Sequence, residues 1–355
     1  MKSSKEILLE DIKNVVKKID CAPLRKKRIL LTGARGLLGS YFAHLMHYLN
    51  SELSYGIEAD LITKNPIAAS SFLQSIVGTP GLSFFAKDVS EPIAYDRAYD
   101  YMIHAAGYGT PAVFVRDPIK TIDVNYIGIQ SMLKSARRRN PSTKILYCSS
   151  SKIYGSPSAE HVPTPETFVG ESSVTSNRAC YIESKRLSEV LCLAYASEFG
   201  MDVKIARPAL TYGPALTFLS GRVISEFMKK AYLYKKIEMK DDGRDLRAYC
   251  YGGDTLRQLL SILLYSKDRI YNVGSSEEEV SIKELAERIG VCMGASVLPG
   301  PGKDEAVTAA PSRVCLDMAK VINEFGFKPE VSLDKGLGRM IDWNMALIKE
   351  GILRP

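Results

Sequence analysis

Histidine and tryptophan are scarce in this chain of 355 residues, which contains four histidines and one tryptophan. A metal ion in a protein needs three or four convergent ligands. The two histidines that lie close together, His44 and His47, have no matching cysteine or acidic ligands nearby in the sequence. The sequence therefore predicts no metal site.

The seven cysteines form no CxxC pair, and their odd number leaves at least one thiol unpaired. Disulfide frameworks belong to oxidising compartments, so this cysteine usage predicts a cytoplasmic protein. No stretch approaches the run of about 18 apolar residues that crosses a bilayer. The N-terminal segment also lacks the continuous apolar region of a secretion signal. We expect no membrane partner.

The chain also lacks a large excess of positive or negative residues: 47 Lys+Arg against 40 Asp+Glu give a net charge of +7. A basic surplus attracts polyanions, but the basic run at residues 137–139 has no interleaved aromatic residues. We interpret this run as the solvated end of a helix and residues 25–28 as a solvated flank. The sequence predicts no nucleic-acid partner.

What the chain does contain is an alternation of two apolar patterns. Residues 1–26 hold apolar side chains at helical spacing and predict an amphipathic helix. Short, wholly apolar strands then alternate with longer amphipathic stretches; they are centred near Leu30, Leu61, Met102, Leu146 and Ile205. This order predicts βαβ units and an α/β fold with a doubly wound parallel sheet covered on both faces.

The alternation ends after Pro208, where proline, glycine and charged loops become frequent. We expect the sheet domain to span residues 27–208, with a return segment near 246–273. Residues 209–345 are predicted to form mainly a smaller, mixed α/β lobe at the carboxyl edge of the sheet. Residues 346–355 are predicted to form a C-terminal tail.

A glycine-rich turn follows the first predicted strand and opens a helix. Its backbone amides and the helix N-terminus suit the pyrophosphate of a dinucleotide. The sequence thus predicts a Rossmann-type sheet that binds NAD or NADP through Gly33, Arg35, Gly36, Leu37, Leu38 and Gly39.

The choice between NAD and NADP depends on the end of the second strand. A carboxylate that binds the adenosine ribose of NAD is expected about 20 residues after the glycines. The strand instead ends in Thr63-Lys64-Asn65, and Asp60 lies earlier. Lys64 would accommodate a 2′-phosphate, which slightly favours NADP, while Asp60 keeps NAD open.

Tyr181 and Lys185 are four residues apart on a predicted helix and share one face. A neighbouring ammonium and a positively charged nicotinamide would lower the pKa of the phenol from about 10. Tyr181 would then serve as an acid or base. Ser150 or Ser151, after the strand near Leu146, would complete the constellation.

The motifs TGARGLLG, KDV, IHAAG, NYIG, SSKIYG, YIESK and RPALTYGP occur in this order. Their combination resembles the extended short-chain dehydrogenase/reductase family, and within it the NAD-dependent epimerases and dehydratases that modify nucleotide sugars. The resemblance runs from about Lys27 to Trp343. Several segments, including PIKTIDVNYIG and NRACYIESKR, are most similar to UDP-glucuronate decarboxylases.

The resemblance implies a two-lobed enzyme that holds the cofactor in the larger lobe and a nucleotide diphosphate in the smaller one, with the sugar between them. It makes Tyr181 the acid/base on a sugar hydroxyl or ketone and Lys185 the ligand of the nicotinamide ribose. It places Asn125 behind Lys185, through a water molecule. The other cofactor contacts that it implies are Asp88, Val89, His104, Ala105 and Ala106. The substrate contacts that it implies are Arg178, Arg222, Arg247 and Arg313, because a guanidinium suits phosphate oxygens.

The sequence departs from these relatives at Ser151-Lys152. The 4,6-dehydratases have an Asp-Glu pair there, and the decarboxylases have a Ser-Glu pair. A cationic lysine cannot abstract a proton unless its pKa is strongly lowered, so we expect no dehydratase activity. A second departure is Leu210, where many relatives have asparagine.

We therefore hypothesise an NAD(P)-dependent oxidoreductase that transfers hydride at C4 of a nucleotide sugar, as a 4-keto-sugar reductase or a 4-epimerase. The alternatives are UDP-glucuronate decarboxylation and, from another class, a non-catalytic cofactor-binding regulatory subunit. By analogy with the family, we expect a homodimer.

Overall fold

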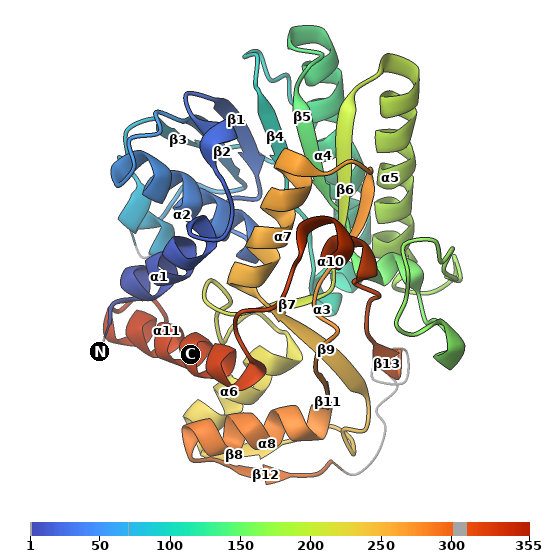
Figure 1. Cartoon of the computed structure of the whole chain (residues 1–355). Helices are drawn as coiled ribbons and strands as arrows, with labels where there is room; N and C mark the ends of the chain where they lie inside the picture. Colours follow the sequence, from blue (N-terminus) through green and yellow to red (C-terminus); the bar gives the residue numbers. More distant parts are fainter. Residues whose placement is uncertain (1, 70, 301–310) are drawn as a thin grey trace.

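The computed structural model describes residues 2–69, 71–300 and 311–355. Its centre is a seven-stranded sheet in which all neighbouring strands are parallel. In spatial order the strands are β10 (Ile270–Val273), β6 (Asp202–Pro208), β5 (Lys144–Cys148), β4 (Tyr101–His104), β1 (Arg28–Thr32), β2 (Glu58–Thr63) and β3 (Leu82–Ala86). This arrangement confirms the predicted Rossmann-type sheet (Figure 1).

Helices cover both faces of this sheet. The helices α2 (Leu37–Ser51) and α7 (Gly252–Tyr265) lie on one face, and α4 (Pro118–Arg139) and α5 (Ala179–Phe199) lie on the other (Figure 1). Successive side chains of a strand point to opposite faces, so Leu30 belongs to one core and Leu31 to the other. Because both faces are buried, the strands read as continuous apolar runs.

The chain leaves the central sheet after β6 and forms a second, smaller group of strands. Its main sheet has the order β11 (Glu279–Ser281), β9 (Leu246–Tyr251) and β13 (Arg313–Val314), with β7 (Leu210–Tyr212) also paired to β9. A separate pair joins β12 (Ser296–Leu298) and β8 (Lys236–Glu238). After β9, the chain returns to the central sheet through α7 and β10.

The remaining elements surround these sheets. The helices are α1 (Ser4–Val16), α3 (Pro111–Arg116), α6 (Val223–Tyr234), α8 (Ile282–Met293), α10 (Ala319–Phe325) and α11 (Leu333–Lys349). Short 3-10 segments are η1 (Ala22–Leu24), η2 (Phe72–Ile76), η3 (Ser151–Tyr154) and η4 (Ala159–His161). Within the described part of the chain, no helix is both long and apolar enough to cross a membrane.

A buried polar cluster fastens α1 to the rest of the molecule. The Asp11 carboxylate accepts hydrogen bonds from the hydroxyls of Tyr41, at 3.0 Å, and Tyr251, at 2.6 Å. It also pairs with the Arg339 guanidinium at 2.7 Å. Asp11 lies on α1, Tyr41 on α2 and Arg339 on α11, so one carboxylate joins the two ends of the chain to the central body.

Candidate active site

The glycine turn lies between the end of β1 and the start of α2. Gly33 has a φ of +74°, and a Cβ there would lie 2.6 Å from the Ala106 backbone. A Cβ on Gly39 would lie 2.1 Å from the Gly33 carbonyl oxygen. Gly36 is the exposed N-cap of α2, where unpaired amides and the helix dipole favour an anion. These residues fit a dinucleotide pyrophosphate.

Leu37 and Leu38 begin α2 and pack against the core, whereas the Arg35 side chain is exposed at the turn. The backbone of Ala105 and Ala106 passes directly beside Gly33. His104 is fully buried; its Nδ1 lies 2.8 Å from the Thr32 hydroxyl, and its ring stacks on Tyr147. Burial, with the charge of Lys185, lowers the pKa of His104 to about 3. Because the His104 side chain is buried, the predicted lining of the cofactor would come from the backbone of residues 104–106.

Asp60 is buried in the middle of β2. Its carboxylate accepts hydrogen bonds from the Tyr99 hydroxyl at 2.5 Å and from Arg97 at 3.0 Å. The Asp60 carboxylate, which was the candidate ligand for the adenosine ribose of NAD, is therefore already hydrogen-bonded within the protein. The exposed Lys64 follows the strand instead, and its Nζ donates to the Tyr108 hydroxyl at 3.2 Å.

Asp88 and Val89 follow β3 and differ in environment. Asp88 pairs with Lys120 of α4 at 2.8 Å. Burial opposes its ionisation, but hydrogen bonds from Lys120 and Ser90 outweigh that effect and lower the pKa of Asp88 to about 2. Val89 is buried in the core beneath α4. Asp88 is thus a negative charge near the carboxyl ends of β2 and β3.

Tyr181 lies at the start of α5, with its ring stacked on Phe114 of α3 at 4.9 Å between centroids. In the chain alone, without the nicotinamide whose positive charge is expected to lower it, the pKa of Tyr181 is raised. Burial is the main cause, and it outweighs the hydrogen bond with Ser150 and the positive charge of Arg222. Tyr181 is therefore protonated at neutral pH.

Ser150 and Ser151 follow β5 and begin η3. Ser150 is buried, and its Oγ accepts a hydrogen bond from the Lys152 backbone amide at 3.2 Å as well as contacting Tyr181. Ser151 is partly exposed, and of the two serines only Ser150 is among the groups that shift the pKa of Tyr181. Of the two predicted serines, the structure therefore places Ser150 beside Tyr181.

Lys185 lies one helical turn after Tyr181 and is only 3% exposed. Its Nζ donates to the Cys148 carbonyl at 2.8 Å and lies 4.8 Å from the centroid of the Tyr147 ring. Burial lowers the pKa of Lys185 to about 8. A Cβ on Gly107 would lie 3.6 Å from this Nζ, so the glycine keeps the approach to the amine open.

Asn125, on α4, is fully buried behind this pair. Its amide nitrogen donates to the Ser184 hydroxyl at 2.9 Å. Its Oδ1 has no hydrogen-bond partner among the described residues. This oxygen faces Gly107, as Lys185 does, because a Cβ there would lie 3.3 Å from it. The position agrees with a role for Asn125 in supporting Lys185 through a bridging group.

The four arginines suggested by the resemblance do not form one cluster. Arg222, the N-cap of α6, is close enough to Tyr181 for their charges to interact, and it donates to the Thr211 carbonyl at 2.9 Å. Arg178, the N-cap of α5, has a pKa lowered by burial and by the charge of Arg247. Together, Arg222, Arg178 and Arg247 extend positive charge from Tyr181 to β9.

Arg247 and Arg313 both carry acidic partners within the chain. Arg247 is buried on β9 and pairs with Asp245 at 3.0 Å. Arg313, on the neighbouring β13, makes two hydrogen bonds to Glu279, at 2.6 and 2.7 Å. A diphosphate would have to share these guanidiniums with carboxylates. The Arg313–Glu279 pairing could not be predicted from local sequence, because it depends on how β11 and β13 align on β9, whereas Asp245 lies only two residues before Arg247.

Two contributors to the site were missed by the sequence reasoning. Phe114 supports the ring of Tyr181, and the Gly109 carbonyl accepts a hydrogen bond from Lys152 Nζ at 3.0 Å. Both lie in the segment between β4 and α4, which carries no motif that marks these contacts. Within the described ranges, no group of three or more His, Cys, Asp or Glu side chains is arranged to hold a metal ion.

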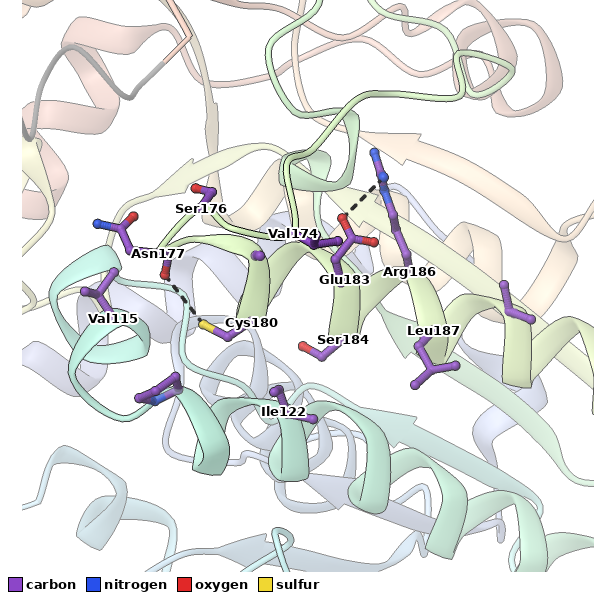
Figure 2. Close-up of a pocket in the computed structure, with 13 residues that line it drawn as sticks. Val115, Ile122, Val174, Ser176, Asn177, Cys180, Glu183, Ser184, Arg186 and Leu187 are labelled. Carbon is purple, nitrogen blue, oxygen red and sulfur yellow. Dashed lines mark hydrogen bonds and ion pairs between the residues drawn. The ribbon is translucent and has the colours of Figure 1, made fainter.

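A separate groove lies on the outer surface, where α3, α4 and α5 meet. It has a volume of about 840 Å³, and its lining includes Val115, Ile122, Cys180 and Leu187 (Figure 2). Four large apolar side chains along α4 and α5 are exposed: Ile119 (75%), Ile122 (40%), Leu187 (49%) and Val190 (61%). The groove therefore forms part of an apolar surface behind the helices that carry Asn125 and Tyr181.

Comparisons with known proteins give a consistent result. Residues 29–274 match the family described as NAD dependent epimerase/dehydratase. UDP-glucuronic acid decarboxylase 3 of Arabidopsis thaliana is 30% identical over 323 residues, which cover 90% of this chain and 89% of that protein. UDP-glucuronic acid decarboxylase 1 of Xenopus tropicalis is 29% identical over 321 residues, which cover 90% of this chain and 72% of that protein.

Solved structures share the fold. A dTDP-glucose 4,6-dehydratase from Streptomyces venezuelae, with NAD and TYD bound, has a TM-score of 0.77 at 23% identity and covers 90% of this chain and 97% of its own. UDP-glucose 4-epimerase from Thermotoga maritima, with UDP-glucose, has a TM-score of 0.74 at 20% identity, with coverage of 92% and 100%. With the family match and the 30% identical relative, we conclude that this chain belongs to the NAD dependent epimerase/dehydratase family.

Proposed function

We propose that this protein transfers hydride reversibly at C4 of a nucleotide-diphosphate sugar, either as a 4-keto-sugar reductase or as a 4-epimerase. The observation that carries the proposal is that Ser150 lies beside Tyr181 while Lys185, one helical turn later, holds its amine beside Gly107 near the glycine turn. The sheet supports this location, since open parallel sheets bind ligands at the carboxyl ends of their strands.

A nicotinamide dinucleotide held by the glycine turn would supply the hydride chemistry. Tyr181 is protonated in the free chain, so it can donate a proton to a C4 ketone oxygen and recover it from a C4 hydroxyl. Ser150 orients the same oxygen through its contact with Tyr181. Lys185, with a pKa of about 8, holds a positive charge that favours the phenolate after the proton leaves.

We propose NADP as the preferred cofactor, although the family is described as NAD dependent and solved neighbours contain NAD. The support is local. The Asp60 carboxylate is already hydrogen-bonded to Tyr99 within the protein, and the exposed Lys64 follows the end of β2. Affinities for NAD+ and NADP+, measured by titration calorimetry, test this assignment. Lys64→Ala should weaken NADP+ binding at least about tenfold and leave NAD+ binding unchanged. Equal losses for both cofactors would contradict it.

We propose that residues 209–345 provide most of the binding surface for the nucleotide diphosphate. The support is the positive charge that extends from Arg222 through Arg178 to Arg247. Burial, with the charge of Arg247, lowers the pKa of Arg178, and a bound diphosphate would relieve that repulsion.

UDP-glucuronate decarboxylation is the second candidate. The relatives named for this activity support it, and so do the positive charges of Arg222 and Arg178 around Lys152, which suit a sugar carboxylate. Loss of CO2 from a 4-keto uronate needs no base, because the ketone accepts the electron pair. Lys152 in place of an acidic residue therefore does not exclude this reaction.

One experiment separates these activities. The purified protein is incubated with UDP-, dTDP-, CDP- and GDP-sugars and their 4-keto forms, with NAD+, NADP+, NADH or NADPH. Stoichiometric consumption of reduced cofactor identifies a reductase. An isomer formed without net consumption identifies an epimerase, and release of CO2 from UDP-glucuronate identifies a decarboxylase. Tight cofactor binding without any turnover would favour the regulatory-subunit alternative.

We propose that the apolar surface of α4 and α5 is the contact between two copies of the chain. Its support is the four exposed apolar residues and the groove beside them (Figure 2). Analytical ultracentrifugation should report a dimer for the wild type and a monomer for Leu187→Asp. The control Leu219→Asp alters a residue that is similarly exposed, at 51%, but lies outside this surface. A monomeric wild type would contradict the proposal.

A further inference from the structure

Lys152 occupies an unusual place for a lysine. It lies in η3, two residues after Ser150, and its Nζ donates to the Gly109 carbonyl at 3.0 Å. The same Nζ lies 4.9 Å from the centroid of the Phe114 ring and 5.2 Å from that of the Tyr181 ring. No ion pair recorded among the described residues includes Lys152, so its amine is held by a carbonyl and two aromatic rings.

The charged groups around this amine repel a positive charge. Arg222 approaches from the N-terminus of α6, and Arg178 approaches from the N-terminus of α5. The side that faces α3 is apolar, since Phe114 covers it, and Tyr181 is protonated. Burial, with these two arginines, lowers the pKa of Lys152 to about 7. At neutral pH a substantial fraction of the amine is therefore neutral and can accept a proton.

Chemistry at C4 places acidic C–H bonds near this amine. In the proposed function, Tyr181 acts on the oxygen at C4, and oxidation there creates a ketone. The hydrogens on C3 and C5 then become acidic, because the ketone accepts the electron pair. The Lys152 amine lies 5.2 Å from the centroid of the Tyr181 ring, so a sugar whose C4 oxygen meets the Tyr181 hydroxyl would have its neighbouring ring carbons within reach of it. An amine that is partly neutral near pH 7 is suited to remove such a proton.

We propose that Lys152 is a catalytic base that removes and returns a proton on a ring carbon next to the C4 ketone. The amine lone pair forms the new N–H bond as the C–H bond breaks. The C–H electron pair becomes the enolate double bond, and the C4 oxygen takes the negative charge, facing Tyr181 and Arg222. Return of the proton reverses these changes, and no oxidant is needed. This proposal rests on the proposed hydride transfer.

Exchange with heavy water tests the proposal. The sugar from the panel that undergoes C4 hydride transfer is incubated with the holoenzyme in D2O, and deuterium at C3 and C5 is read by NMR. Wild type should incorporate deuterium at one of these carbons, at a rate that rises through a pH of about 7. Lys152→Met should lower the rate of this exchange, taken relative to the C4 hydride-transfer rate of the same variant, at least about 100-fold.

Lys152→Arg separates a base from a simple positive charge. Arginine keeps the charge but cannot be deprotonated in proteins, so it should fail to exchange while still binding the sugar. Exchange retained in either variant would overturn the proposal, as would covalent trapping of the sugar on Lys152 by borohydride, which indicates imine formation instead. Hydride transfer at C4 without deuterium at C3 or C5 refutes only the role of Lys152. No hydride transfer with any sugar refutes the proposed function as well.

Discussion

The burial of Lys185 predicts a specific dependence of stability on pH. This amine is 3% exposed, and no ion pair in the described part of the chain includes it. Burial lowers its pKa from 10.5 to about 8. One pKa unit corresponds to about 1.4 kcal/mol, so keeping the ammonium inside the folded protein at neutral pH costs about 3 kcal/mol relative to the unfolded chain.

The sign of the effect follows from which state binds the proton. Below a pH of about 8, both states bind it and the penalty is complete. Between about pH 8 and 10.5, the unfolded chain keeps this proton while the folded chain loses it, so folding becomes more favourable as the pH rises. Above that range, both states are neutral and the penalty is absent.

Lys185→Met removes this titration while keeping an unbranched side chain. Urea unfolding of both proteins at several pH values between about 7 and 10.5 measures their difference in free energy of unfolding. The comparison cancels the titration of other groups. Wild type should gain about 3 kcal/mol relative to the variant across this range. The Cys148 hydrogen bond lost in the variant shifts all values equally. A constant difference, or a gain by the variant, would refute the reasoning.

Three further changes have expected outcomes. Tyr181→Phe should lower turnover by about 100- to 10,000-fold and keep cofactor binding, as measured by product formation and calorimetry; turnover near that of wild type would contradict the mechanism. Gly39→Ala should lower cofactor affinity at least about tenfold, because its Cβ would lie 2.1 Å from a backbone oxygen, whereas Gly338→Ala, with no atom nearby, should bind normally. Asp11→Ala should lower the free energy of unfolding by about 3 to 5 kcal/mol, because Arg339 loses its buried partner; an unchanged urea midpoint would count against that role.

Local pattern was sufficient to predict the architecture. The apolar strands, the glycine turn and the Tyr181–Lys185 spacing each depend on a few neighbouring residues, and the central sheet agrees with them. The predicted choice between Ser150 and Ser151 could not be made in advance, because both follow the same strand. It depends on which hydroxyl the turn into η3 directs toward α5.

Long-range contacts decided what the sequence could not predict. Asp60 kept NAD open in the sequence, but Tyr99 and Arg97, about 40 residues away, occupy its carboxylate. The predicted lowering of the pKa of Tyr181 involves the charge of a bound nicotinamide, whereas in the chain alone burial by Phe114 and the rest of the site raises this pKa. Lys152 was expected to be cationic unless its pKa were strongly lowered, and burial, with the charges of Arg222 and Arg178, lowers that pKa to about 7. Burial and the meeting of distant charges are not encoded in local spacing.

The cytoplasmic location and the dimer stay predictions.

Hydride transfer at C4 is tested most directly with nucleotide sugars that carry deuterium at C4, incubated with the protein and NAD+ or NADP+. Mass spectrometry and NMR should find deuterium on the recovered cofactor, as for a reductase run in reverse, or at C4 of an isomeric sugar, as for an epimerase that returns the hydride. Either signal should be far smaller with Tyr181→Phe. Unlabelled cofactor together with unchanged sugar for every substrate, despite measurable cofactor binding, would contradict the claim.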